Sequence, residues 1–180
     1  MTGHGQYEHV FAPLRGARAW GVRVPGYIDR DEPVQRFAPM ACTIYLVLDE
    51  GYFRVDCLGN HGQLGFREVS EPTPSPEWDL DEDEFAVGDY GSHFLGDDGQ
   101  LNAVTQVRYA LNDESDRAAG TVRAAEIRFQ YGGALFLDPM YYWGIRLQGA
   151  GAYERWLAWE RGDAHRRAVF GPLEEHIWIP

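Results

Sequence analysis

Two stretches of alternating sequence decide the fold, LNAVTQVRYAL at residues 101–111 and TVRAAEIRFQY at residues 121–131. In each stretch, one parity is apolar and the other is polar. Successive side chains of a strand point to opposite faces, so both stretches predict half-buried strands of an antiparallel sheet with one face in water. The apolar parity holds Val107, Tyr109, Leu111, Ala125, Ile127, Phe129 and Tyr131, and the polar parity holds Gln106, Arg108, Glu126, Arg128 and Gln130.

The sequence that follows extends this pair of strands into a four-strand meander. Residues 134–137 and 141–147 predict two more strands, with Asp138-Pro139 as the turn between them. Residues 112–120 are a polar connection.

Upstream, residues 41–58 predict a β-hairpin. With Glu50-Gly51 at its tip, Leu48 would face Phe53, Leu46 would face Val55, and Ile44 would face Cys57. The hairpin would turn both cysteines, Cys42 and Cys57, inward as small core residues. Shorter strands are expected at residues 64–69 and 93–95.

Near the C-terminus the apolar period lengthens towards 3.6 residues. In AYERWLAWERG, residues 152–162, a helix would place Tyr153, Trp156 and Leu157 on one face. A second short helix would follow Asp163 as its N-cap and run to Phe170. The expected fold is α+β and β-rich. It is a single antiparallel sheet or partly open barrel or sandwich of about 7–9 strands, with one or two short C-terminal helices, in one domain over residues 1–180.

Composition bounds the function. The chain has 28 acidic and 16 basic residues, all of the latter arginines, and a formal charge of −12. Nucleic acid is therefore not expected as a direct ligand, because phosphate binding needs clustered cations. No apolar run reaches membrane-spanning length, and the N-terminus lacks a signal-peptide pattern, so we expect a cytoplasmic protein without membrane contact. The sequence does not indicate an oligomeric state.

The negative charge is concentrated in an acidic, Pro-rich excursion at about residues 68–98, which contains no arginine. Pro72, Pro74 and Pro76 exclude a helix or a central strand at its start. A calcium loop is not expected in the run that follows. Aligning Asp79, Asp81 and Asp83 with the first EF-hand ligands places Glu84 where glycine is required.

Motifs for catalysis are scarce. The six histidines form no zinc motif with the cysteines, and no nucleophile elbow, phosphate loop or dinucleotide fingerprint occurs. The remaining catalytic option is Asp89 or Asp56 working with His61 or His93 as general acid and base, a pairing of low specificity among so many acids. We therefore predict no catalytic residue, no metal site and no cofactor, and favour binding over catalysis.

The leading hypothesis is a non-catalytic, cytosolic binding protein that presents an acidic, Trp-containing loop to a basic protein surface, as an inhibitor or an immunity-type protein does. Clustered carboxylates would steer such a partner, and a tryptophan would anchor it. A fold-stabilising contact between the loop and the sheet is the other role open to this tryptophan. The predicted binding residues are Glu77, Trp78, Asp79, Asp81, Glu82, Asp83 and Glu84.

Two alternatives remain open. The first is a small-molecule-binding protein or hydrolase with a pocket between the sheet and the C-terminal helix, lined by Tyr109, Phe129 and Trp156. The second is a structural component of a larger assembly, in which the hairpin of residues 101–131 pairs edge to edge with a neighbour.

Overall fold

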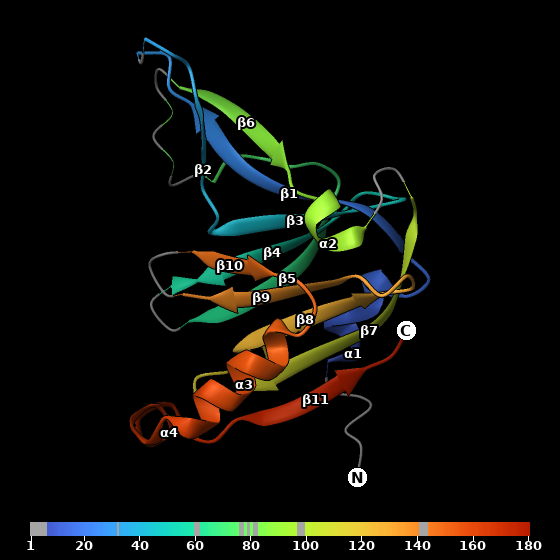
Figure 1. Ribbon diagram of the computed structural model, residues 1–180, viewed down its shortest axis with the longest axis vertical. Helices are drawn as coiled ribbons and strands as arrows, with labels where there is room; N and C mark the ends of the chain where they lie inside the picture. The colour runs from blue at the N-terminus through green and yellow to red at the C-terminus, as the bar shows by residue number, and fades with distance from the viewer. Residues whose placement is uncertain are drawn as a thin grey trace.

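The computed structural model describes residues 7–31, 33–59, 62–75, 78, 80, 83–96, 100–140 and 144–180. Within these ranges it is β-rich, with eleven strands and short helices, which confirms the α+β class (Figure 1). The elements are α1 (Glu8–Phe11), a 3-10 turn (Ala12–Leu14), β1 (Arg18–Ile28), β2 (Phe37–Pro39), β3 (Thr43–Leu48), β4 (Tyr52–Leu58), β5 (Gln63–Val69), β6 (Glu84–Asp89), α2 (Ser92–Leu95), β7 (Asn102–Leu111), β8 (Ala124–Phe129), β9 (Ala134–Pro139), β10 (Ile145–Gln148), α3 (Ala152–Gly162), α4 (Ala164–Phe170) and β11 (Glu174–Trp178).

The strands form one continuous antiparallel sheet in the order β10-β9-β8-β7-β1-β3-β4-β5, with β2 and β6 on β1 and β11 on β7. The sheet curls, because β5 at one end of this order meets Val122, just before β8, through two backbone hydrogen bonds of 2.7 and 3.0 Å. The main core lies inside the curl and contains the buried parity of β7 and β8, namely Val107, Tyr109, Leu111, Ala125, Ile127 and Phe129.

The predicted meander is confirmed as β7 to β10, but Asp138-Pro139 is not its turn. Both residues belong to β9, where Asp138 pairs with Arg146 and Pro139 pairs with Ile145. Proline ends the strand, a position where its missing N–H is tolerated. The strand expected at residues 93–95 is also wrong, because Ser92–Leu95 forms the helical turn α2.

The first hairpin is confirmed with a different register. Leu46 faces Phe53 and Ile44 faces Val55, a shift of two residues from the expected pairing. The shift leaves every side chain on its predicted face, since the side-chain period of a strand is two. The turn explains it: Gly51 has φ +71°, so it supplies the left-handed residue after Asp49 and Glu50.

The two cysteines lie at the far end of this hairpin, where the Cys57 N–H donates to the Cys42 carbonyl at 2.8 Å. Cys57 packs against the main core while remaining partly exposed. Burial raises the pKa of its thiol to about 11, which keeps it protonated near neutral pH. This placement agrees with a packing role.

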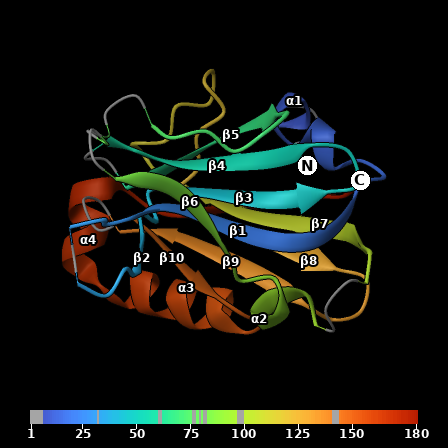
Figure 2. The same cartoon turned by 90° about the horizontal axis from the view of Figure 1, so that it is seen from above.

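Both C-terminal helices are confirmed. The α3 helix lies against the outer face of the sheet (Figure 2) and buries Tyr153, Trp156 and Leu157 in a second cluster with Phe136. The carboxylate of Asp163 accepts from Arg166 N at 3.0 Å and so caps α4. No helix among the described residues is long and apolar enough to span a membrane.

Three strands form an arm that extends beyond the rest of the sheet, at the top of Figure 1. The second half of β1 is its centre, with β2 and β6 on either side. Gly26 and Gly88 leave room for the Phe37 ring, because a Cβ at either position would lie 2.7 Å from a ring carbon. The acidic excursion enters the arm at β6.

Candidate functional site

The predicted acidic site is only partly within the described residues. Glu77, Asp79, Asp81 and Glu82 lie outside them, whereas Trp78, Asp83 and Glu84 lie inside. Trp78 is partly buried, and its ring centroid is 6.3 Å from that of Phe85 on β6. This contact places Trp78 beside β6 of the arm.

Most of the described carboxylates of the excursion have no ion-pair partner among the described residues. Glu84, at the start of β6, pairs with Arg30 at 2.8 Å, with both side chains more than half exposed. Over the described part of the chain, Glu68, Glu71, Asp83 and Asp89 form no ion pair. The other acids of residues 68–98 lie outside the described ranges.

Among the described residues, neither Asp56 nor Asp89 forms a hydrogen bond or ion pair with His93, the pairing that remained as the catalytic option. Asp56 accepts from Thr43 Oγ1 at 2.7 Å and from Arg54 Nε at 2.8 Å. Asp89 accepts from the Gly91 N–H at 2.8 Å, while the His93 ring centroid lies 6.3 Å from those of Tyr90 and Phe94. His61 lies outside the described residues.

The three residues expected to line a pocket between the sheet and the C-terminal helix do not come together. Tyr109 and Phe129 belong to the main core, whereas Trp156 belongs to the cluster beneath α3 on the other face of the sheet.

The edge of β7 that faces away from β8 is paired with β1 at one end and with β11 over Val107–Leu111. Edge-to-edge assembly through that side of the hairpin would have to displace these strands.

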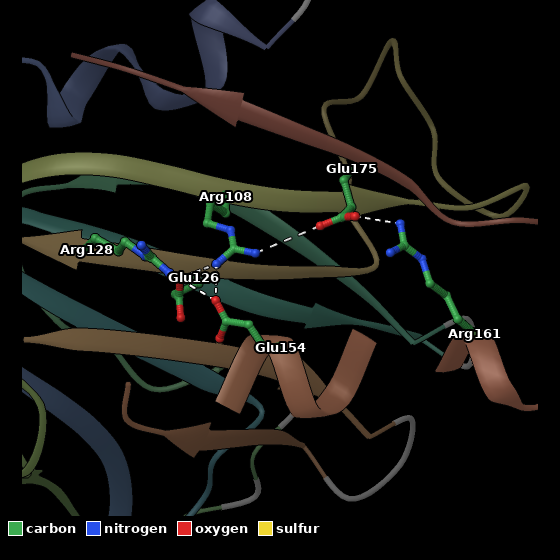
Figure 3. Close-up of polar contacts among 6 residues, drawn as sticks. All are labelled: Arg108, Glu126, Arg128, Glu154, Arg161 and Glu175. Atoms are coloured by element: carbon green, nitrogen blue, oxygen red, sulfur yellow. Dashed lines mark hydrogen bonds and ion pairs between the residues drawn. The ribbon is translucent and has the colours of Figure 1, made fainter. Parts of the chain in front are cut away.

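The polar face of β7 and β8 is the largest departure from expectation. Glu126 is fully buried rather than solvent-facing. One of its oxygens, Oε2, accepts from Arg128 Nε at 2.6 Å and lies 3.4 Å from Arg108 Nη1 (Figure 3). Both arginines also bind Glu154 of α3, so the helix is joined to the sheet by charge.

This network continues to the last strand. Arg108 Nη2 lies 3.9 Å from Glu175 Oε2 on β11, and Arg161 at the end of α3 binds Glu175 Oε1 at 2.5 Å (Figure 3). The hydrogen bond from Arg108 holds the pKa of Glu154 below its ordinary value. The arrangement ties four elements together, β7, β8, α3 and β11.

A second network lies deeper beneath the same helix. Arg123 is 4% exposed and donates to Asp138 Oδ1 at 3.0 Å and to Glu160 Oε1 at 2.8 Å. Arg146 binds the second oxygen of Asp138, Oδ2, at 2.5 Å, and Arg166 binds the second oxygen of Glu160, Oε2, at 2.7 Å. Buried charges persist only when paired in this way.

Four of the hollows that the described residues line are large enough to consider. Two, of about 430 and 440 Å³, lie on either side of Arg128. A third, of about 340 Å³, lies between α3 and β10. The fourth, of about 240 Å³, lies between the N-terminal helix and β11, lined in part by Tyr7, Tyr109 and Trp178.

We expect the packing around the fourth hollow to be the first part of the fold that is lost at high pH. Burial raises the pKa of both Tyr7 and Tyr109 from 10.0 to about 12. Because the folded pKa is the higher one, the stability from neutral phenols is complete below pH 10 and is lost as pH rises towards 12. Absorbance at about 295 nm and far-UV circular dichroism should therefore report tyrosinate formation and unfolding together.

The variant Tyr109→Phe is the control for this prediction, since it removes one ionisable phenol and keeps the ring. Its alkaline midpoint should move to higher pH relative to its own stability at neutral pH. An alkaline midpoint that does not move would show that other groups set this limit.

Neither a cluster of metal ligands among the described residues nor a comparison with known proteins assigns a function to this chain. Over the described ranges, no three or more His, Cys, Asp or Glu side chains gather in a way that could hold a metal ion. No protein-family model matches the sequence, and comparison with curated proteins and with solved structures found no match.

Proposed function

We propose that this chain is a non-catalytic binding protein that engages a basic surface of another protein through its acidic arm. One observation carries the proposal: of the five described acids in residues 68–98, Glu84 alone forms an ion pair within the described chain. The excursion therefore keeps charge that a partner can neutralise.

The surroundings of the arm support this reading. The arm projects from the sheet, so a partner can approach it from several sides (Figure 1). Asp29 and Asp31 near the end of β1 add carboxylates, and neither forms an ion pair with a described residue. In contrast, the arginines beneath α3 are already bound to carboxylates, as shown in Figure 3.

The Arg30–Glu84 ion pair, the one formed by the described residues of the arm, offsets little of the arm's negative charge. Exposed ion pairs contribute about 0–1 kcal/mol, because water screens them and ordering two long side chains costs entropy. Guanidinium groups of a partner would form charge-assisted hydrogen bonds with the same carboxylates. Such a surface raises the association rate at low ionic strength.

The test compares two variants of equal charge. Asp83→Asn/Glu84→Gln removes two charges from the arm, and Glu50→Gln/Asp113→Asn removes two exposed charges elsewhere. Proteins that bind at low salt and elute as salt rises are identified by mass spectrometry. For a basic protein found in this way, the arm variant should lower the association rate by about tenfold at low salt.

The control variant should associate at the unaltered rate. Extending the arm variant to Asp79 and Asp81 should slow association further. If the arm variant and the control variant lower the association rate by the same factor, net charge explains the effect, and the assignment of binding to the arm is wrong.

A further inference from the structure

We propose that the groove between α3 and β10 binds a small aromatic anion, a planar ring that carries a carboxylate or a phosphate. The site is independent of the acidic arm, and it lies on the other side of the sheet from the main core. Its lining consists of Arg146, Gln148, Ala152, Arg155, Trp156 and Trp159.

The groove is formed by one face of a helix beside an edge strand. Ala152, Arg155, Trp156 and Trp159 are spaced three or four residues apart, so they lie on one side of α3, and they line the groove together with two side chains of β10. Ala152 provides a small floor, and the hollow of about 340 Å³ is large enough for a compact ligand.

The charge of the groove is unusual for this protein. No acidic side chain belongs to its described lining, although the whole chain carries −12. Its polar side chains are two guanidinium groups, an amide and two indoles. Donors therefore dominate, which excludes a cation and favours an anion as the occupant.

Arg155 is available to a ligand. It is exposed and makes no hydrogen bond or ion pair with any described residue, whereas its neighbour Arg146 is bound to Asp138. The Arg155 Nη1 atom lies 3.2 Å from the position that a Cβ on Gly151 would take, at the start of α3. A guanidinium there binds carboxylate and phosphate through two parallel hydrogen bonds.

The two tryptophans supply the ring contacts. Trp159 is 56% exposed, and Arg166 lies 4.9 Å from its ring centroid. Trp156 is 4% exposed, and its indole Nε1 has no hydrogen-bond partner in the described structure. A planar ligand can stack on Trp159, and the Trp156 side chain lines the groove beside it.

Isothermal titration calorimetry with four probes tests the proposal. AMP and indole-3-acetate each combine a ring with an anion, adenosine has the ring alone, and inorganic phosphate has the anion alone. At least one of the first two should bind saturably, and adenosine and phosphate should bind at least about tenfold more weakly. AMP alone indicates a phosphate ligand, and indole-3-acetate alone indicates a carboxylate.

Variants locate the binding in the groove. Arg155→Gln should weaken binding about tenfold while leaving the unfolding midpoint unchanged, because Arg155 forms no hydrogen bond or ion pair with a described residue. Trp159→Leu should weaken binding to a similar extent. The matched control is Arg161→Gln, on the same helix but outside the groove, which should bind the ligand normally.

The proposal fails if neither ring-bearing anion binds at about 1 mM. Equal affinity of adenosine and AMP, with no binding of indole-3-acetate, also overturns it, because the anion would then contribute nothing. Binding that survives both Arg155→Gln and Trp159→Leu places the ligand elsewhere and overturns it as well.

Discussion

Replacing Arg123 with Met is expected to lower the free energy of unfolding by about 3 kcal/mol. The guanidinium of Arg123 lies between two carboxylates, Asp138 at 3% and Glu160 at 6% exposure. Methionine preserves much of the apolar volume beside Trp156 but leaves both carboxylates with one charged partner fewer. A buried charge without its partner is costly, since it has lost water and gained no compensating hydrogen bond.

The expected loss is at the lower end of the range for buried ion pairs, because Arg146 and Arg166 still bind Asp138 and Glu160. Urea unfolding followed by circular dichroism measures it. The control is Arg161→Met, which removes an exposed pair with Glu175 and should cost less than about 1 kcal/mol. A similar cost for both variants would mean that the inner network does not depend on Arg123.

A double-mutant cycle resolves the pair itself. Arg123→Met and Glu160→Gln should be non-additive, with a coupling of about 1–3 kcal/mol, because the first removes the partner whose charge the second neutralises. Additive losses would indicate that Arg123 acts through packing on Trp156 rather than through charge.

The networks beneath α3 show where sequence reasoning reaches its limit. Alternation separates the two faces of β7 and β8 correctly, and the helical period identifies α3 and its buried side chains. Neither pattern shows that the helix covers the polar face. The apolar face of α3 needs a surface to cover, and Glu154 and Glu160 on the same helix match the sheet arginines. This match of charges is the feature of the sequence that could have predicted the contact between α3 and the polar face of the sheet.

The arm was missed for a different reason. Pro25 lies inside β1, and a proline argues against a central strand because it lacks an N–H. In the structure Pro25 lies opposite Val87 of β6, and its carbonyl accepts from Met40 N at 2.8 Å. Short strands such as β2 and β6 carry too few residues for a clear alternation. The acidic excursion was recognised by composition, whereas its attachment to the arm was not.

Phe11→Ala is the second substitution with a large expected cost, about 3–5 kcal/mol, as for other buried aromatic truncations. Phe11 is fully buried although it belongs to a helix of four residues. Its ring centroid lies 5.3 Å from those of Phe66 and Tyr109, and 5.8 Å from that of Trp178. The side chain therefore joins the N-terminal segment to β5, β7 and β11.

The loss should be local as well as global. Trp178 also donates from Nε1 to Glu8 Oε2 at 3.0 Å, so loosening α1 removes two supports of β11. Hydrogen exchange should therefore quicken in β11, which Phe11 and Glu8 contact, more than in β3, which lies between β1 and β4 in the sheet. Tyr131→Ala is the control, since that ring is 58% exposed and its loss should change stability by less than about 0.5 kcal/mol. Uniform quickening across the sheet would mean that α1 stabilises the whole fold cooperatively, and the assignment of Phe11 as an anchor for β11 would be wrong.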